Sequence, residues 1–69
     1  MPERVYKFID LVGTSSISWE DAARKAVETA GKSLTELRIA EITKLDMTIE
    51  DGKVNSYRAR VSVSFRLED

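Results

Sequence analysis

The sequence predicts an α+β fold of order β-α-β-β, in which a three-stranded antiparallel sheet is partly wrapped around one helix. Three observations predict this class: a long period-two alternation near the C-terminus, a helix-spaced apolar stripe after Ser18, and a hairpin signal at Asp51-Gly52. The 69 residues contain no linker, repeat or low-complexity tract, so residues 1–69 are predicted to form one domain.

The first predicted element is a strand from Arg4 to Val12. Apolar side chains occupy both of its faces, with Val5, Ile9 and Leu11 on one and Tyr6, Phe8 and Val12 on the other. Apolar residues on both faces indicate a strand that is covered on both sides. The glycine and hydroxyl residues from Gly13 to Ser16 are predicted to form a turn.

A helix is predicted after Ser18, which is a favourable N-cap and forms a capping-box-like motif with Asp21. One apolar stripe follows at helical spacing: Trp19, Ala22, Ala23, Ala26, Val27, Ala30 and Leu34. Because most of this stripe is alanine, the helix is expected to lie close against a sheet. Its outer face is expected to carry ion pairs four residues apart, namely Glu20–Arg24, Asp21–Lys25 and Glu28–Lys32.

The second strand is predicted from Leu37 to Glu50. Its apolar residues change parity partway, from Ala40 and Ile42 to Leu45 and Met47, which indicates a bulge or two halves with different partners. Asp51-Gly52 then predicts a tight hairpin into the third strand.

The third strand shows the clearest pattern, because Tyr57 to Leu67 alternates almost without interruption. The apolar face carries Tyr57, Ala59, Val61, Val63, Phe65 and Leu67, and the opposite face carries Arg58, Arg60, Ser62, Ser64 and Arg66. This arginine–serine face has three interpretations: pairing with acids of a neighbouring strand such as Glu41, binding of an anionic ligand, or contact with another subunit. Together with the small size of the chain, it favours self-assembly.

Composition excludes several classes of function. The absence of cysteine and histidine removes disulfides, thiolate nucleophiles, the usual general base and the usual zinc ligands. With 11 basic and 12 acidic residues, the chain has no broad electrostatic footprint for nucleic acid. No apolar run is long enough to span a membrane and no secretory leader is evident, so a soluble cytoplasmic protein is expected. Because no nucleophile is paired with a base, we predict that the chain is not an enzyme.

Four local features remain open to more than one interpretation. Gly13–Ser16 before a helix is interpreted as an ordinary loop rather than an anion site. Asp10 and Asp46 lie inside strands, where each is expected to form a salt bridge, with a metal site at a symmetry axis as the alternative. Trp19 is predicted to pack in the core rather than stack on a ligand.

The order of several short motifs resembles the dodecin family over essentially the whole chain. The motifs are Val5-Tyr6-Lys7, Val12-Gly13-Thr14-Ser15, Ala40-Glu41-Ile42, Asp51-Gly52 and Phe65-Arg66-Leu67-Glu68. This resemblance implies a hollow homododecamer of cubic 23 symmetry, in which uncovered sheet faces meet between subunits. It also implies storage of flavin (FMN or riboflavin), stacked in pairs at interfaces near the twofold axes.

The chain departs from the family pattern at the positions that the resemblance assigns to flavin. Ile39 stands where the family has a stacking tryptophan, Arg58 follows Tyr57 where a glutamine is usual, and Asp46-Met47 replaces Arg-Gly. Ser18-Trp19-Glu20, Asp46-Met47 and Tyr57-Arg58 instead resemble a tryptophan-lacking branch that includes a calcium-binding dodecin. No metal ligand is assigned by this resemblance.

From these residues we expect a dodecin-like shell that binds or stores a small ligand or ion, with Ile39, Asp46 and Arg58 at altered flavin positions and flavin binding weak or absent. Any bound metal is expected to be calcium, magnesium or sodium at an interface, because carboxylates without histidine or cysteine favour hard cations. The alternatives are a genuine flavin-storage dodecin, a structural assembly module without ligand and, most remotely, an enzyme that uses Arg58 with Asp46.

Overall fold

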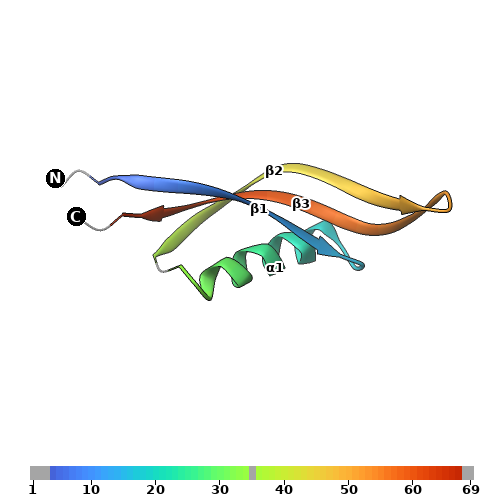
Figure 1. The fold of residues 1–69 in the computed structure, drawn as a ribbon, viewed down its shortest axis with the longest axis horizontal. Helices are drawn as coiled ribbons and strands as arrows, with labels where there is room; N and C mark the ends of the chain where they lie inside the picture. Colours follow the sequence, from blue (N-terminus) through green and yellow to red (C-terminus); the bar gives the residue numbers. More distant parts are fainter. Residues whose placement is uncertain (1–3, 35, 68–69) are drawn as a thin grey trace.

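The computed structural model describes residues 4–34 and 36–67 and contains one helix packed on a three-stranded antiparallel sheet (Figure 1). The elements follow the predicted order: β1 (Tyr6–Ser15), α1 (Trp19–Gly31), β2 (Leu37–Glu50) and β3 (Lys53–Arg66). β3 lies in the middle of the sheet, between β1 and β2. The predicted fold class is therefore confirmed.

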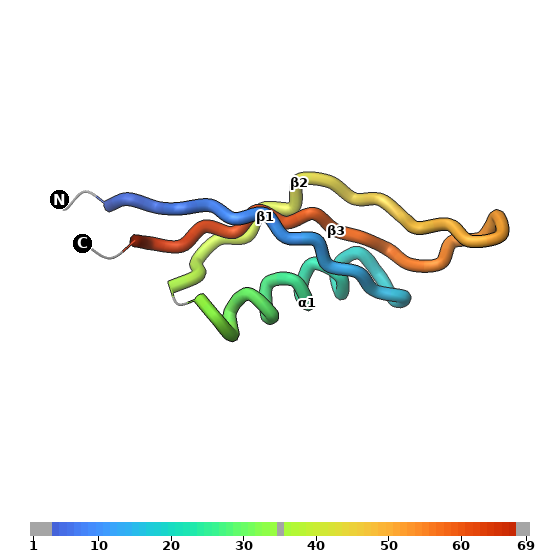
Figure 2. Tube along the Cα trace, viewed as in Figure 1, coloured from blue at the N-terminus to red at the C-terminus, as the bar shows by residue number. Residues whose placement is uncertain are grey.

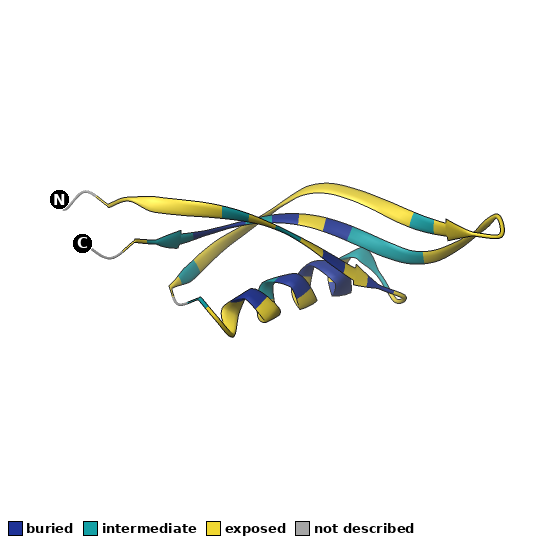
Figure 3. Cartoon of the chain, viewed as in Figure 1, coloured by how far each residue is buried: buried dark blue, intermediate teal, exposed yellow. Residues whose placement is uncertain are grey.

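The molecule is elongated, with principal extents of 54 × 20 × 13 Å. The helix lies under β1 and β3, and the β2–β3 hairpin continues beyond the start of α1 to a free tip (Figures 1 and 2). β2 has few contacts with the helix and is exposed along most of its length (Figure 3). The helix thus covers the middle of the sheet, and the hairpin end is left uncovered.

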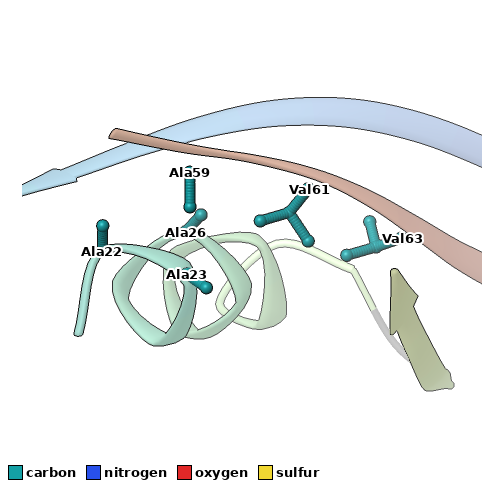
Figure 4. Close-up of a cluster of buried hydrophobic side chains, with 6 residues drawn as sticks. All are labelled: Ala22, Ala23, Ala26, Ala59, Val61 and Val63. Atoms are coloured by element: carbon teal, nitrogen blue, oxygen red, sulfur yellow. The ribbon is translucent and has the colours of Figure 1, made fainter. Parts of the chain in front are cut away.

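The buried core is small and lies between α1 and β3 (Figure 4). It consists of Ala22, Ala23, Ala26, Ala59, Val61 and Val63, against which Ile9, Leu11, Val27 and Leu37 pack. The predicted apolar face of β3 is confirmed, because Ala59, Val61 and Val63 are all fully buried or nearly so. The alanine stripe of α1 faces them, which is how the sequence brings the helix close to the sheet.

The prediction of a turn at Gly13–Ser16 is wrong for its first three residues. β1 continues through Gly13, which pairs with Ala59, and ends at Ser15 opposite Tyr57. Gly13 is needed because α1 passes directly over it: a Cβ there would overlap the Ala22 carbonyl oxygen and lie 3.0 Å from the Ala26 Cβ. The glycine therefore serves close packing of helix and strand rather than a change of chain direction.

The helix begins as predicted and ends earlier than its apolar stripe. The Ser18 hydroxyl accepts a hydrogen bond of 3.0 Å from the Asp21 amide, which confirms the N-cap. The helix ends at Gly31, so Leu34 lies outside it, although its amide still donates to the Ala30 carbonyl at 2.9 Å. The weak helix propensity of Gly31 accounts for the end of the helix at this point.

The irregular pattern of β2 arises from bulges, as its change of parity predicts. The register with β3 shifts between Ile42 and Lys44, so Ala40 and Ile42 share the helix-side face with Leu45. At the hairpin tip, Asp51 and Gly52 have φ angles of 52° and 74°, the left-handed pair that a two-residue turn requires. Both predictions are confirmed.

Candidate functional site

The two faces of the sheet differ in character, and the candidate residues lie on the face away from the helix. Ala59 faces α1, so its neighbour Arg58 projects from the opposite face, which we call the outer face. Arg58 pairs in register with Asp46 of β2 and with Thr14 of β1. Ile39 lies opposite Ser64 and is also on the outer face.

Asp46 and Arg58 form a two-point ion pair across β2 and β3. The Arg58 Nε donates to Asp46 Oδ1 at 2.7 Å, and the second guanidinium nitrogen donates to Oδ2 at 2.9 Å. Such a fork fixes the orientation of both groups more strictly than a single contact. The side chains of Arg58 and Asp46 remain 40% and 52% exposed, so the pair is accessible from outside the chain.

The pair is held in its charged form. Hydrogen bonds from Arg58 lower the pKa of Asp46 below its ordinary range, against the opposing effect of partial burial, and the charges of Arg58 and Arg60 lower it further. The same hydrogen bonds raise the pKa of Arg58. The interpretation that the arginine row pairs with an acid of the neighbouring strand is confirmed for Arg58, but the acid is Asp46, whereas the example, Glu41, lies opposite Ser62. The salt bridge expected for Asp46 is confirmed.

Trp19 contacts the same strand pair from the other side of the sheet. Its indole Nε1 donates a hydrogen bond of 2.9 Å to the Asp46 carbonyl oxygen, and its ring meets the Tyr57 ring edge-on at 5.1 Å. Trp19 is only half-buried and does not belong to the buried cluster, so the prediction of core packing is correct for the direction of the side chain and wrong for its environment.

Ile39 is separated from the pair within one chain. Its side chain is 69% exposed. Six residues of strand lie between Ile39 and Asp46, a separation of about 20 Å. The structure therefore brings Asp46 and Arg58 together but does not bring Ile39 to them. A pocket that contains all three positions requires a second copy of the chain.

The segment before α1 is not arranged to bind an anion. The Ser15 hydroxyl donates to Asp21 Oδ2 at 2.6 Å and accepts from the Ile17 amide at 2.9 Å. The Ser15 hydroxyl is thus engaged by a buried carboxylate, whose negative charge disfavours an anion beside it. Hydrogen bonds from Ser15, Arg24 and Lys25 lower the pKa of Asp21 far below its ordinary range, so this carboxylate stays ionised.

The ion pairs expected along α1 are confirmed only in part. Asp21 and Lys25 are paired at 3.0 Å as predicted. Arg24 also pairs with Asp21, at 2.6 Å, instead of with the exposed Glu20. Buried against the end of β1, Asp21 offers Arg24 a carboxylate that the Ser15 hydroxyl already holds in place.

The remaining strand acids make no site within one chain. Asp10 and Glu41 both lie opposite Ser62 on the outer face, and neither forms an ion pair with another residue in the described ranges. The salt bridge expected for Asp10 is therefore not found among residues 4–34 and 36–67. The same ranges contain no group of three or more acidic, histidine or cysteine residues arranged to hold a metal ion.

Two hollows lie away from the ion pair. A groove of about 580 Å³ follows β1 and the second half of α1 and is lined mainly by Ile9, Leu11, Ala26, Ala30 and Leu34. A smaller hollow of about 110 Å³ includes Ile39 and Val63. The larger groove contains none of the three predicted positions and has only Lys25 as a charged group, so we do not assign the ligand site to it.

Sequence reasoning missed two contacts of the site. Counting back from the Asp51-Gly52 turn places Asp46 opposite Tyr57, and only the register shift between Thr48 and Ile49 moves it to Arg58. The hydrogen bond from Trp19 to the Asp46 carbonyl joins residues 27 positions apart, and no local pattern signals it.

Within the described residues, no helix is long and apolar enough to cross a membrane.

Comparison with known proteins gives a consistent family. The family model described as Dodecin matches residues 5–68. The chain is 41% identical over 63 residues to calcium dodecin of Mycobacterium tuberculosis, covering 91% of this chain and 89% of that protein. It is 38% identical over 66 residues to a dodecin of Thermus thermophilus, covering 96% of each.

Solved structures agree with these matches. Dodecin from Streptomyces coelicolor superimposes with a TM-score of 0.92 at 35% identity, over 100% of this chain and 99% of that one. The crystal structure of Mycobacterium tuberculosis calcium dodecin, described as having a novel calcium-binding site, gives a TM-score of 0.84 at 43% identity, over 93% and 91% of the two chains.

Proposed function

Because this chain belongs to the dodecin family, we propose that it is a non-enzymatic protein that assembles as a homododecamer and binds a small ligand or metal ion, with its flavin positions altered. The observation that carries the proposal is the two-point Asp46–Arg58 ion pair on the outer face. It occupies two of the three positions that the family pattern assigns to flavin, and Ile39 occupies the third.

The shape and surface of the single chain support self-assembly. The radius of gyration is 14.4 Å, whereas about 11 Å is expected for a compact chain of this length. The accessible surface is 5407 Å², about 1000 Å² more than a compact monomer of 7.8 kDa exposes. Exposed large apolar side chains lie along β2 and the hairpin, among them Ile42, Leu45, Met47, Ile49 and Val54. Because the family resemblance implies homo-oligomers, we expect further copies of the same chain to cover these exposed side chains.

The residues present do not fit a stacked flavin. Ile39 provides no aromatic face for an isoalloxazine ring, whose stacking on an aromatic side chain is worth about 0.5–1.5 kcal/mol beyond buried area. Arg58 cannot act as a neutral hydrogen-bonding edge, because Asp46 holds it as a charged fork. A flavin that covered the pair would have to displace water from two charged groups.

A hard cation fits the donor chemistry better, provided that copies share it. Carboxylate and hydroxyl oxygens of Asp10, Glu41 and Ser62 meet in one row across the outer face. Such oxygens suit calcium or magnesium. One chain supplies too few of them for a complete coordination sphere, so a cation bound here would lie between subunits. The 41% identity to a protein named calcium dodecin supports calcium as the ion to test first.

Riboflavin binding across a variant series tests the proposal. The quenching of riboflavin fluorescence is measured for wild type, Ile39→Trp, Arg58→Gln and the double variant. Wild type should bind weakly or not at all, each single variant should bind poorly, and the double variant should recover measurable binding. The double variant restores both a stacking ring and a neutral edge, whereas Ile39→Leu serves as a control that changes the side chain without adding a ring.

The ion pair adds a further variant to this series. Arg58→Gln leaves the Asp46 carboxylate without its partner, so adding Asp46→Asn to the double variant should strengthen binding again. Tight riboflavin binding by wild type would contradict the proposal and favour a genuine flavin-storage dodecin. An intact dodecamer that binds neither riboflavin nor any of calcium, magnesium or sodium would favour a purely structural module.

A further inference from the structure

Asp46 is held from both faces of the sheet at once. On the outer face, its carboxylate accepts the two hydrogen bonds of Arg58. On the helix side, its backbone carbonyl accepts the indole Nε1 hydrogen bond of Trp19 at 2.9 Å. One residue of β2 therefore connects the first residue of α1 to the exposed ion pair.

The strand that carries Asp46 is irregularly paired, so this second contact helps to fix the position of Asp46. β2 is an edge strand and has no neighbour on its other side within the part of the chain that the structure describes. Its register is irregular on both sides of Asp46, with shifts between Ile42 and Lys44 and between Thr48 and Ile49. The extra residue is Thr43 of β2 at the first shift and Asn55 of β3 at the second. Because β2 is paired on one edge and its pairing is irregular on both sides of Asp46, the strand alone fixes this residue weakly, whereas the Asp46–Arg58 fork tolerates little movement.

Trp19 is placed to remove that freedom. Its ring is supported edge-on by Tyr57, the residue that precedes Arg58. The same indole thus contacts β3 through Tyr57 and β2 through the Asp46 carbonyl. We propose that Trp19 is a positioning residue, which holds Asp46 from the helix side so that its carboxylate keeps Arg58 in one orientation at the outer-face site.

Trp19→Phe is the direct test, because it removes the N–H donor together with the five-membered ring of the indole and still leaves an aromatic ring to pack against Tyr57. The readouts are the pKa of the Asp46 carboxyl and the exchange rate of the Arg58 Nε proton, both followed by NMR on the full-length assembled protein. Removal of one hydrogen bond should raise the Asp46 pKa toward its ordinary value and speed the Arg58 exchange about two- to tenfold.

A matched control separates positioning from general loosening. Thr43→Val removes the hydrogen bond of 3.2 Å from the Thr43 hydroxyl to the Arg60 carbonyl, which also links β2 to β3 but does not involve Asp46. The control should leave both readouts as in wild type. Equal changes in the two variants, or no change in Trp19→Phe, would overturn the proposal.

The coupling also has to operate in reverse, which keeps it testable if Trp19→Phe fails to fold. Trp19 is the single tryptophan of the chain, so its indole N–H gives one resonance. Arg58→Gln should speed the exchange of that proton about two- to tenfold, because coupling between two groups is reciprocal. An unchanged indole exchange rate in a folded Arg58→Gln variant would also overturn the proposal.

The relevance of the Trp19 contact to ligand binding rests on the function proposed above. The pKa and proton-exchange measurements themselves require neither flavin nor metal. Riboflavin binding by wild type would therefore contradict the proposed function without affecting the role of Trp19. Failure of the exchange measurements would leave the proposed function unaffected.

Discussion

At the residue scale, two aspartates with lowered pKa values have different environments. Asp21 is buried, and its carboxylate accepts a hydrogen bond of 2.6 Å from the Ser15 hydroxyl and forms ion pairs with Arg24 and Lys25. Asp46 is half exposed and relies mainly on Arg58. Both carboxylates are ionised in the folded chain at neutral pH, so protonation of either one at low pH should destabilise the fold. Since Asp21 is the more strongly shifted and the more buried, it should dominate the acid response.

The first prediction is that acid destabilises the fold through Asp21. Its pKa in the folded chain lies below the ordinary value of 3.8, so at low pH the unfolded chain binds a proton that the folded chain does not. This contribution to the free energy of unfolding is complete above about pH 5 and declines as the pH falls toward the folded pKa. Thermal melting from pH 7 to pH 2 should show this decline in wild type.

Two variants assign the acid effect to this residue. Asp21→Asn should be less stable than wild type at pH 7 but should lose less stability as the pH falls. Ser15→Ala keeps the carboxylate and removes the hydrogen bond that lowers the pKa most, so it should give an intermediate slope. If Asp21→Asn showed the same slope as wild type, another group would be responsible.

At the element scale, the contact between α1 and the sheet depends on small residues. Alanines line the helix, Ala59 lies opposite on β3, and Gly13 lies on β1 beneath Ala22. The stripe predicts a close approach from sequence, but the part played by Gly13 does not follow from it. A glycine before hydroxyl residues is equally typical of a turn, and only the position of the helix above β1 distinguishes the two.

The second prediction concerns this contact. Gly13→Ala should lower the free energy of unfolding by about 1–3 kcal/mol, because the new methyl group overlaps the backbone of α1 and the helix has to shift. Gly31→Ala is the matched control: among the described residues, its Cβ would contact only Leu37 Cδ1, at 3.9 Å. That substitution should be neutral or stabilising, by up to about 1 kcal/mol. Chemical denaturation at one fixed protein concentration measures both.

A Gly13→Ala variant as stable as Gly31→Ala would show that the helix does not require the glycine. Comparison at one concentration is essential, because the stability of an oligomer depends on concentration. Circular dichroism should confirm that both variants retain the helix.

At the scale of the whole molecule, the single chain is an incomplete globule. It is longer and more exposed than a compact chain of its size, and among residues 4–34 and 36–67 only Val61 and Val63 are large side chains that are fully buried. Twelve large apolar residues of the described chain remain exposed, so association still has a large apolar surface to bury. Stability of the fold and assembly are therefore expected to be linked.

The third prediction is that the protein is a dodecamer at micromolar concentration and that this assembly stabilises the fold. Truncation of Arg60 on the outer face, or of Phe65 at the end of the sheet opposite the hairpin, should weaken the assembly. For Phe65→Ala the cost should be about 3 kcal/mol per subunit. Light scattering and thermal melting provide the measurements. Glu28→Ala, on the exposed face of α1, should leave both unchanged. A stable folded monomer would contradict the prediction.

The fourth prediction concerns the metal. A chain without histidine or cysteine should bind hard cations in preference to zinc. Equilibrium dialysis with elemental analysis should find calcium or magnesium bound weakly and only to the assembled protein, and Asp10→Asn or Glu41→Gln should reduce the amount several-fold. Tight stoichiometric zinc would contradict this expectation, as would binding that persists in both variants.

The sequence alone determined the order of elements, the buried face of β3 and the hairpin, because each depends on local periodicity or on the turn chemistry of neighbouring residues. The alternation of Ala59, Val61 and Val63 and the pair Asp51-Gly52 are of this kind. The sequence also placed a bulge within β2, since a change of parity is visible along one strand.

Only the tertiary structure decided which of these residues meet. Asp46 faces Arg58 because a second bulge shifts the register by one residue, and a register shift of one changes every partner beyond it. Trp19 reaches the Asp46 carbonyl, and Gly13 lies beneath Ala22, because the helix crosses the sheet at one particular position. Such contacts join distant segments through packing, and packing is a property of the whole fold rather than of any stretch of sequence.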